Sequence, residues 1–238
     1  MNTNSELILE KVNAAKPIFG LTPFTLLDYP NHSACILWFA GCNMRCLYCY
    51  NPEIVLGKGK ISADEILLFL KSRQNLLDAV VFSGGECLIH KHIINLICEV
   101  KKMGFLVKID TNGSTPETLQ KLLHAKLIDY VALDFKATSS KFKSITKSDL
   151  YEPFTKSLEL LLSNNFPFEV RTTLHSDLLT KQDLSEMIAY LETKNYRGNY
   201  YIQYFKNHTP TLSKMEYSNN DIDANRLSTQ NIKVVIRD

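Results

Sequence analysis

The chain has 238 residues, of which 45% are hydrophobic and 22% are charged, and its formal net charge is +2. This composition is typical of a globular protein, and so small a charge gives no indication of a nucleic-acid surface. The longest apolar run, ACILWFAGC, is too short to span a membrane, and the N-terminus lacks a signal-peptide pattern, so a cytoplasmic protein is expected.

Short β-branched runs alternate with longer segments of helical periodicity along most of the chain. In chain order the pattern predicts a strand at 33–39, a helix at 62–74, a strand at 78–85, a helix at 91–104, a strand at 105–113, a helix at 115–126, a strand at 129–137, a helix at 151–164, a strand at 167–175, a helix at 180–194 and a strand at 199–205. Ser62 and Glu65 form a predicted capping box, and Thr115 is the expected N-cap before Pro116.

Six βα repeats imply a parallel sheet, because parallel neighbours need a crossover helix. A closed eight-fold barrel needs about 250 residues, so a partial (β/α)6 TIM-like barrel fits this α/β chain better. No Pro/Gly-rich linker divides the sequence, which predicts one domain over 1–238. Its core is expected at about 18–206, followed by a C-terminal extension at 207–238 in which IKVVIRD adds one edge strand.

The chemically conspicuous residues fall at the C-terminal ends of the predicted strands, where the active sites of βα-barrels are built. The motifs there are the cysteine loop at 41–51, SGGE at 83–86, DTNG at 110–113, DFK at 134–136, RTTLH at 171–175 and QYF at 203–205. Strand alternation puts Asp134 and Lys136 on the same face of the fourth predicted strand, and it puts Arg171 and His175 on the same face of the fifth. Charged residues on a strand face are explained by a polar cavity rather than by apolar core.

Three of the six cysteines, Cys42, Cys46 and Cys49, have the spacing Cys-x3-Cys-x2-Cys, whereas Cys35 and Cys98 are expected to be buried in the core. The three could form the core face of a helix. They could bind zinc with Cys87 or a histidine as the fourth ligand. They could also be three ligands of a [4Fe–4S] cluster that leave one iron open to another group.

The segment CNMRCLYC resembles the signature of the radical S-adenosylmethionine (SAM) enzymes, and SGGE resembles their Gly-Gly-Glu motif. The resemblance covers roughly residues 18 to 206. It implies that Cys42, Cys46 and Cys49 hold a [4Fe–4S] cluster whose open iron chelates the methionine part of SAM. It also implies that Glu86 receives the amino group of SAM.

Residue chemistry supports this interpretation. A glycine pair such as Gly84-Gly85 lets the backbone approach a ligand closely, and the carboxylate of Glu86 can accept hydrogen bonds from a cationic amine. Tyr48 is expected near the adenine, or alternatively as an anchor of the loop.

More specific phrases, GLTPFTLLDYP, FSGGE, LVKIDTNGS, DYVALDFKA and PFEVRTTL, resemble the activating enzymes of glycyl-radical proteins, and most closely the anaerobic ribonucleoside-triphosphate reductase activating proteins. The resemblance implies that one electron, from a flavodoxin- or ferredoxin-type donor, cleaves SAM. The resulting 5′-deoxyadenosyl radical would remove a glycine Cα hydrogen from a partner reductase.

The resemblance also assigns roles to individual residues. The positions expected around SAM are Tyr48, Gly84, Gly85, Glu86, Asp110, Asn112, Lys136, Arg171 and His175. The positions that could hold a monovalent cation are Asp110, Thr111 and Asp134. The alternative for Asp134 is a salt bridge with Lys136 or Arg171, and the alternative for His175 is a surface position.

Two residues depart from the family pattern: Tyr50 stands where relatives have histidine, and Cys87 stands where they have proline. Cys87 could be an extra thiol open to oxidation near the cluster.

The sequence leaves two alternative functions open. One is a radical SAM enzyme acting on a small molecule, similar to 7-carboxy-7-deazaguanine synthase, and the other is a non-enzymatic zinc or electron-transfer module. The extension at 207–238 could close a small-molecule pocket or leave room for a partner's loop. If a partner loop enters the barrel, changes at 206–238 should impair glycyl-radical formation and spare SAM cleavage.

Overall fold

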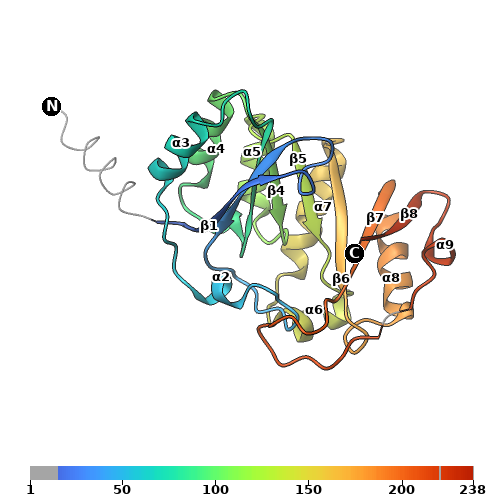
Figure 1. Ribbon diagram of the computed structural model, residues 1–238. Helices are drawn as coiled ribbons and strands as arrows, with labels where there is room; N and C mark the ends of the chain where they lie inside the picture. Colours follow the sequence, from blue (N-terminus) through green and yellow to red (C-terminus); the bar gives the residue numbers. More distant parts are fainter. Residues whose placement is uncertain (1–15, 220, 238) are drawn as a thin grey trace. The chain divides into compact units, whose positions relative to one another are not determined.

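The computed structural model describes residues 16–219 and 221–237. These fall into two units built from interleaved segments (Figure 1). Of the described residues, the first unit contains 16–42 together with Glu53–Asp110 and Glu117–Tyr130. The second contains Asn43–Pro52, Thr111–Pro116 and the residues from Val131 onward. Each unit combines a sheet with helices, which confirms the α/β class.

The strands of the first unit follow one another in the order of the sequence. They are β1 (Ile18–Thr25), β2 (Ala34–Phe39), β3 (Ala79–Gly84) and β4 (Leu106–Thr111). Strands β2, β3 and β4 are parallel, as the βα pattern predicts, but β1 pairs with β2 in the antiparallel sense. The parallel strands put the cysteine loop and SGGE at the carboxyl ends of β2 and β3.

Strand β1 was not predicted. Its pairing with β2 shifts register between Thr22 and Thr25, a stretch that includes Pro23. A proline cannot donate to a ladder and is tolerated in strands at sheet edges or bulges. The short interrupted alternation of IFGLTPFT therefore hid an edge strand whose pairing is decided by β2.

The helical segments near these strands are α2 (Pro52–Leu56), α3 (Ala63–Lys71), η1 (Cys87–Ile89), α4 (Ile93–Lys102) and α5 (Pro116–His124). Helices α3 and α4 lie side by side (Figure 1). The capping box of Ser62 and Glu65 is present as predicted. The capping role of Thr115 was wrong, because its buried hydroxyl has no hydrogen-bond partner among the described residues.

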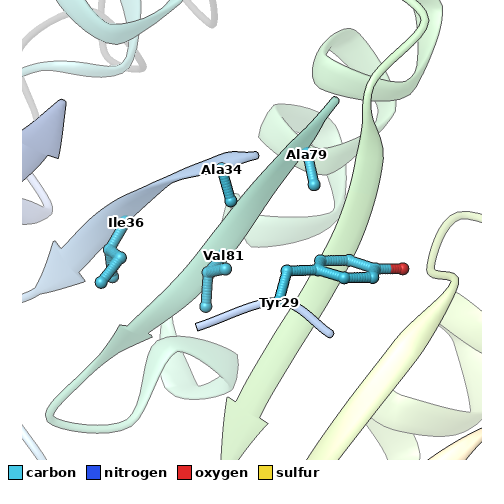
Figure 2. Close-up of a cluster of buried hydrophobic side chains, with 5 residues drawn as sticks. All are labelled: Tyr29, Ala34, Ile36, Ala79 and Val81. Carbon is cyan, nitrogen blue, oxygen red and sulfur yellow. The ribbon is translucent and has the colours of Figure 1, made fainter. Parts of the chain in front are cut away.

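The core of the first unit includes a cluster on one face of β2 and β3 (Figure 2). Its members are Tyr29, Ala34, Ile36, Ala79 and Val81, with Trp38, Leu106 and Tyr130 packed against them. Burial, with a contribution from Asp129, raises the pKa of Tyr29 to about 12. This apolar face holds β2 and β3 in register, and their carboxyl ends carry the site residues of this unit.

The strands of the second unit are all parallel and also follow the order of the sequence. They are β5 (Tyr130–Asp134), β6 (Phe168–Leu174), β7 (Gly198–Tyr204) and β8 (Ile232–Arg237). Strand β8 confirms the predicted edge strand. Arg237 anchors it by a bidentate ion pair with Glu169 at 2.8 Å and by stacking 3.5 Å from the ring centroid of Tyr201.

The helices of this unit are α6 (Ser139–Thr146), α7 (Tyr151–Ser163), α8 (Lys181–Thr193) and α9 (Ala224–Leu227). Helix α6 was not predicted. Carbonyl groups in its last turn accept hydrogen bonds from the cysteine loop. Thr180 and Asp183 form a capping box at the start of α8. Among the described residues, no helix is both long and apolar enough to cross a bilayer.

Candidate functional site

In the first unit the loop after β3 packs directly on the chain that leads into the cysteine motif. Gly85 donates its N–H to the carbonyl of Phe39 at 2.9 Å, and Glu86 donates to the carbonyl of Gly41 at 2.9 Å. A Cβ atom at Gly85 would lie 1.8 Å from the carbonyl oxygen of Gly41 and 3.3 Å from the Cβ of Cys42. The glycine is therefore required for packing of one loop on the other, a reason that the sequence interpretation did not foresee.

Glu86 is fully buried and caps the 3₁₀ helix η1, where its Oε1 accepts from the N–H of Leu88 at 3.2 Å. Nearby, the imidazole Nε2 of His90 lies 3.0 Å from the carbonyl oxygen of Ala40. The Glu86 contact shapes the loop itself, and the His90 contact fixes the loop relative to the residues just before Cys42. The predicted acceptor Glu86 is thus a preorganised carboxylate in the same unit as Cys42.

Asp110, near the end of β4, uses its two carboxylate oxygens to contact two different side chains, those of Lys108 and Ser83. Its Oδ1 lies 2.6 Å from the ammonium of Lys108, and its Oδ2 accepts from the hydroxyl of Ser83 at 3.0 Å. The sequence interpretation missed Lys108, although its i, i+2 relation to Asp110 puts both on one strand face. The buried ion pair with Lys108 balances the charge of Asp110.

Cys87 is fully buried, and its thiol lies 3.6 Å from the carbonyl oxygens of both Phe82 and Asp110. Burial raises the pKa of Cys87 well above its ordinary value. A neutral, buried thiol is a poor nucleophile and a poor target for oxidants. The expectation that Cys87 is open to oxidation was therefore wrong, because the strand ends enclose its sulfur.

The six cysteines all fall within the described residues, and none forms a disulfide. Cys35 is buried as predicted, whereas Cys98 is only half-buried. Cys42 belongs to the first unit, and Cys46 and Cys49 belong to the second. Among the described residues, no group of three or more His, Cys, Asp or Glu side chains is arranged to hold a single metal ion.

The loop that carries Cys46 and Cys49 is held by main-chain hydrogen bonds within the second unit. The N–H of Arg45 donates to Thr146 at 2.8 Å, and the N–H of Leu47 donates to Ile145 at 3.0 Å, so the last turn of α6 supports the loop. Burial raises the pKa of the Cys46 thiol. Metal binding to such a thiol must release its proton, which couples cluster assembly to pH.

A second support comes from the DTNG motif. Asn112 donates from Nδ2 to Oδ1 of Asn43 at 3.1 Å, and Asn43 donates to the hydroxyl of Ser114 at 2.7 Å. The Oδ1 of Asn112 and the hydroxyl of Thr111 accept from the N–H groups of Ser114 and Gly113. Asn112 and Thr111 thus shape their own turn, and Asn112 links it to the cysteine loop. The sequence interpretation missed Asn43.

Asp134 lies between two cations at the end of β5. Its Oδ2 is 2.9 Å from Nζ of Lys136, and its Oδ1 accepts a short hydrogen bond from Nε of Arg171, the residue paired with it on β6. Burial by itself would raise the pKa of Asp134, but Arg171 and Lys136 outweigh it and lower the pKa to about 2. The predicted salt bridge is present, with both partners at once.

Tyr48 is buried, and its hydroxyl has no hydrogen-bond partner among the described residues. Its ring centroid lies 6.0 Å from Nζ of Lys136. Burial raises the pKa of Tyr48, so the hydroxyl stays protonated. An unsatisfied buried hydroxyl is costly, so this one calls for a partner from water or from a bound molecule.

His175 lies just beyond β6 and is fully buried. Its Nδ1 accepts from the N–H of Asp177 at 3.2 Å, and its Nε2 lies 3.0 Å from the carbonyl oxygen of Glu216. Phe205 packs against the ring, with centroids 4.6 Å apart. The ring therefore joins β6 to the C-terminal segment, and both of its nitrogens already have main-chain neighbours.

Comparison with known proteins places the chain. The model of the Radical SAM superfamily matches residues 36–193. A glycyl-radical enzyme activating enzyme, by its name, from Methanocaldococcus jannaschii is 34% identical over 177 residues, covering 71% of this chain and 73% of its own. The pyruvate formate-lyase-activating enzyme of Clostridium pasteurianum is 30% identical over 216 residues, covering 86% and 87%.

Among solved structures, Streptococcus suis SuiB bound to S-adenosylmethionine has a TM-score of 0.63 at 15% identity, covering 85% of this chain and 52% of SuiB. This likeness shows the fold and confirms the predicted partial barrel of the radical SAM type. The chain belongs to the radical SAM superfamily. It is an enzyme whose cofactors are a [4Fe–4S] cluster and SAM. The hydroxyl of Tyr48, which has no partner among the described residues, fits a site that binds a ligand.

Proposed function

We propose that this protein is a glycyl-radical enzyme activase. Its relatives from M. jannaschii and C. pasteurianum, each at least 30% identical over most of both chains, bear the names of such activating enzymes. The observation that carries the proposal within the chain is the Cys-x3-Cys-x2-Cys loop. Its main chain is held by hydrogen bonds, and it contains the buried Tyr48, whose hydroxyl has no partner in the part of the chain that the structure describes.

Cys42, Cys46 and Cys49 would supply three thiolates, which leaves one iron for SAM. When bound, the cluster and SAM supply one-electron chemistry: reductive cleavage gives methionine and a 5′-deoxyadenosyl radical, which becomes 5′-deoxyadenosine by taking the glycine hydrogen atom. The three cysteines are close in sequence, and each half of the loop has its own support. Gly85 packs against the residues around Cys42, while α6 and Asn112 position the rest.

Glu86 would accept hydrogen bonds from the amino group of SAM, because its carboxylate is buried and fixed at the end of β3. Lys136 and Arg171 would attract the carboxylate of SAM, with Asp134 holding both cations in position. The hydroxyl of Tyr48 would take its missing partner from the bound cofactor. Gly84, where a Cβ would lie 2.4 Å from the main-chain N of Phe39, and Asp110, bound by Ser83, complete the set as positioning residues.

Three earlier expectations are not part of this proposal. The ring nitrogens of His175 face main-chain groups, so His175 has a supporting role. Asp110 and Asp134 each bind a lysine, and Asp134 also binds Arg171, so a monovalent cation is not needed to balance them. The hydroxyl of Thr111 accepts within its own turn.

The partner that the sequence phrases favour is an anaerobic ribonucleoside-triphosphate reductase, with a flavodoxin or ferredoxin as electron donor. The phrases GLTPFTLLDYP, LVKIDTNGS and PFEVRTTL support this choice, since they lie outside the cysteine and Gly-Gly-Glu motifs that every radical SAM enzyme needs. The glycine to be activated would sit on a loop of that partner.

The test is made on anaerobically reconstituted, chemically reduced protein. We expect 5′-deoxyadenosine from SAM, together with a glycyl-radical electron paramagnetic resonance signal when a candidate reductase is added. Cys46→Ala should abolish both products, and Cys98→Ala, a half-buried cysteine outside the motif, should retain them. Product without a radical on any glycyl-radical enzyme would favour a small-molecule substrate, and absence of product from the clustered protein would overturn the proposal.

A further inference from the structure

The C-terminal segment 205–218 lies along the loop that carries Cys46 and Cys49. The N–H of Leu212 donates to the carbonyl of Cys49 at 3.0 Å, and the N–H of Ser213 donates to the carbonyl of Leu47 at 3.1 Å. Figure 1 shows this red-orange segment passing beneath α6 at the lower edge of the second unit. Residues more than 160 positions apart in the sequence are thus joined by main-chain hydrogen bonds.

The two sides of the cysteine loop use different atoms. Its N–H groups, at Arg45 and Leu47, donate to the last turn of α6, whereas its carbonyls, at Leu47 and Cys49, accept from the C-terminal segment. Leu47 is bound on both sides. Because both the N–H groups and the carbonyls of the loop have main-chain partners, contacts within the protein restrain its backbone on both sides.

Side chains fasten the segment at two points. At its start, the hydroxyl of Tyr50 accepts from the N–H of Lys206 at 2.6 Å, and the Tyr50 ring stacks on Phe205 with centroids 5.4 Å apart. Toward its end, Nε2 of His175 lies 3.0 Å from the carbonyl oxygen of Glu216.

The segment is also closed on itself. Asn207 donates to the carbonyl of Ser218 at 2.9 Å and accepts from its N–H at 2.8 Å. Two anchors and an internal pair therefore give residues 205–218 a defined conformation of their own.

We propose that residues 205–218 form a clamp that preorganises the Cys46–Cys49 loop for cluster binding, with Tyr50 and His175 as its anchoring residues. The inference rests on the proposed role of Cys46 and Cys49 as cluster ligands. A loop already ordered loses less conformational entropy when the cluster binds, so the clamp raises cluster affinity. Tyr50 and His175 act through the main chain, which makes them positioning residues.

The clamp explains why a tyrosine stands at position 50, where relatives have histidine. The phenol of Tyr50 accepts from the N–H of Lys206, and its ring stacks on Phe205 at the same time. It also changes the expectation for the tail. Changes within 205–218 that remove its hydrogen bonds to the cysteine loop or to its anchors should weaken the cluster site itself, and so reduce SAM cleavage and glycyl-radical formation together. Selective loss of radical formation would then be confined to changes beyond this segment.

The test uses the full chain, first without a cluster and then after reconstitution. Tyr50→Phe removes the hydroxyl but keeps the ring, and Leu212→Pro removes the N–H that binds Cys49. The matched controls are Tyr217→Phe, at an exposed tyrosine, and Leu212→Ala, which keeps the N–H. Amide hydrogen exchange over residues 45–49 is measured on the cluster-free protein, and bound iron and sulfide are measured after reconstitution with limiting iron.

We expect the amides of residues 45–49 to exchange about fivefold faster in Tyr50→Phe and Leu212→Pro, the effect of losing one net hydrogen bond. Iron content should fall and air-induced bleaching of the cluster should accelerate in these two variants, while both controls match the unchanged protein. Unchanged exchange and iron content in Tyr50→Phe would overturn the clamp, even if Leu212→Pro fails to fold. A wild-type protein that binds its cluster but cleaves no SAM would contradict the proposed function and leave the exchange result standing.

Discussion

The side-chain amide of Asn112 donates to Oδ1 of Asn43 at 3.1 Å and so joins the turn after β4 to the start of the cysteine loop. The same residue accepts from the N–H of Ser114, and Asn43 in turn donates to the hydroxyl of Ser114. All three belong to the second unit, and Asn112 is 5% exposed. A buried amide at this position is therefore a structural link between residues that are 69 positions apart in sequence.

Asn112→Ala should lower the free energy of unfolding by about 1–2 kcal/mol, because it leaves Asn43 and the N–H of Ser114 without their partner in a buried setting. Cluster content after reconstitution should fall with it, since the cysteine loop loses one support. Urea unfolding and iron analysis measure the two effects. Asn199→Ala, at an exposed asparagine whose side chain donates to the hydroxyl of Tyr201, is the control and should change neither. A fully stable Asn112→Ala protein would contradict this account.

Gly85→Ala should be severely destabilising, by more than about 3 kcal/mol, because its Cβ would lie 1.8 Å from the carbonyl oxygen of Gly41 and main-chain atoms cannot easily move apart. Gly20→Ala is the matched control. Its Cβ would have only Cδ1 of Trp38 nearby, at 4.0 Å, so we expect little change. Thermal unfolding of the cluster-free proteins compares the two. Equal melting temperatures would show that the loop after β3 can move away from Gly41.

The lowered pKa of Asp134 predicts a pH-dependent contribution to stability. Its folded pKa is about 2, below the ordinary value of 3.8, so the ion pairs stabilise the protein fully above pH 4. This contribution, about 2 kcal/mol at most, is lost as the pH falls from about 4 to about 2.

Asp134→Asn isolates this effect. The variant should be less stable than the unchanged protein near neutral pH, because Lys136 and Arg171 lose their counter-charge, and the difference should shrink below pH 4. Urea unfolding at several pH values provides the measurement. Asp149→Asn, which breaks the exposed pair with Lys143, should cost less than about 1 kcal/mol. A difference that stays constant down to pH 2 would argue against the lowered pKa.

Cys87 should resist alkylation in the folded, cluster-free protein, because its thiol is enclosed and its pKa is raised well above the ordinary value by burial. Half-buried Cys98 on α4 should react before Cys87, which makes it the internal reference. Peptide mapping by mass spectrometry after timed iodoacetamide treatment measures both. Labelling of Cys87 at the rate of Cys98 would mean that the end of β3 opens readily.

Local sequence signals predicted most of the regular structure because they act within a few residues. The Ser62 capping box and the short apolar and β-branched runs of β2, β3 and β6 are examples. Strand β1 and helix α6 escaped this reasoning. Strand β1 exists through its pairing with β2, and the first turn of α6 has no side-chain cap that marks it. Thr115 had the right residue type for a cap, but its hydroxyl is buried and has no hydrogen-bond partner among the described residues.

The sequence by itself determined the chemistry of this protein. The spacing of its cysteines, the Gly-Gly-Glu motif and the positions of charged residues at strand ends are all linear patterns, and each residue type carries its reactivity wherever the chain places it. Only the tertiary structure decided which of these residues are committed to one another. Lys108 binds Asp110, Asp134 binds Lys136 and Arg171, and His175 meets Glu216, because pairing depends on distances between segments far apart in the chain. The same reason hid the role of residues 205–218. Their hydrogen bonds to the cysteine loop are made by main-chain atoms, which every residue type carries, so the sequence shows no pattern for them.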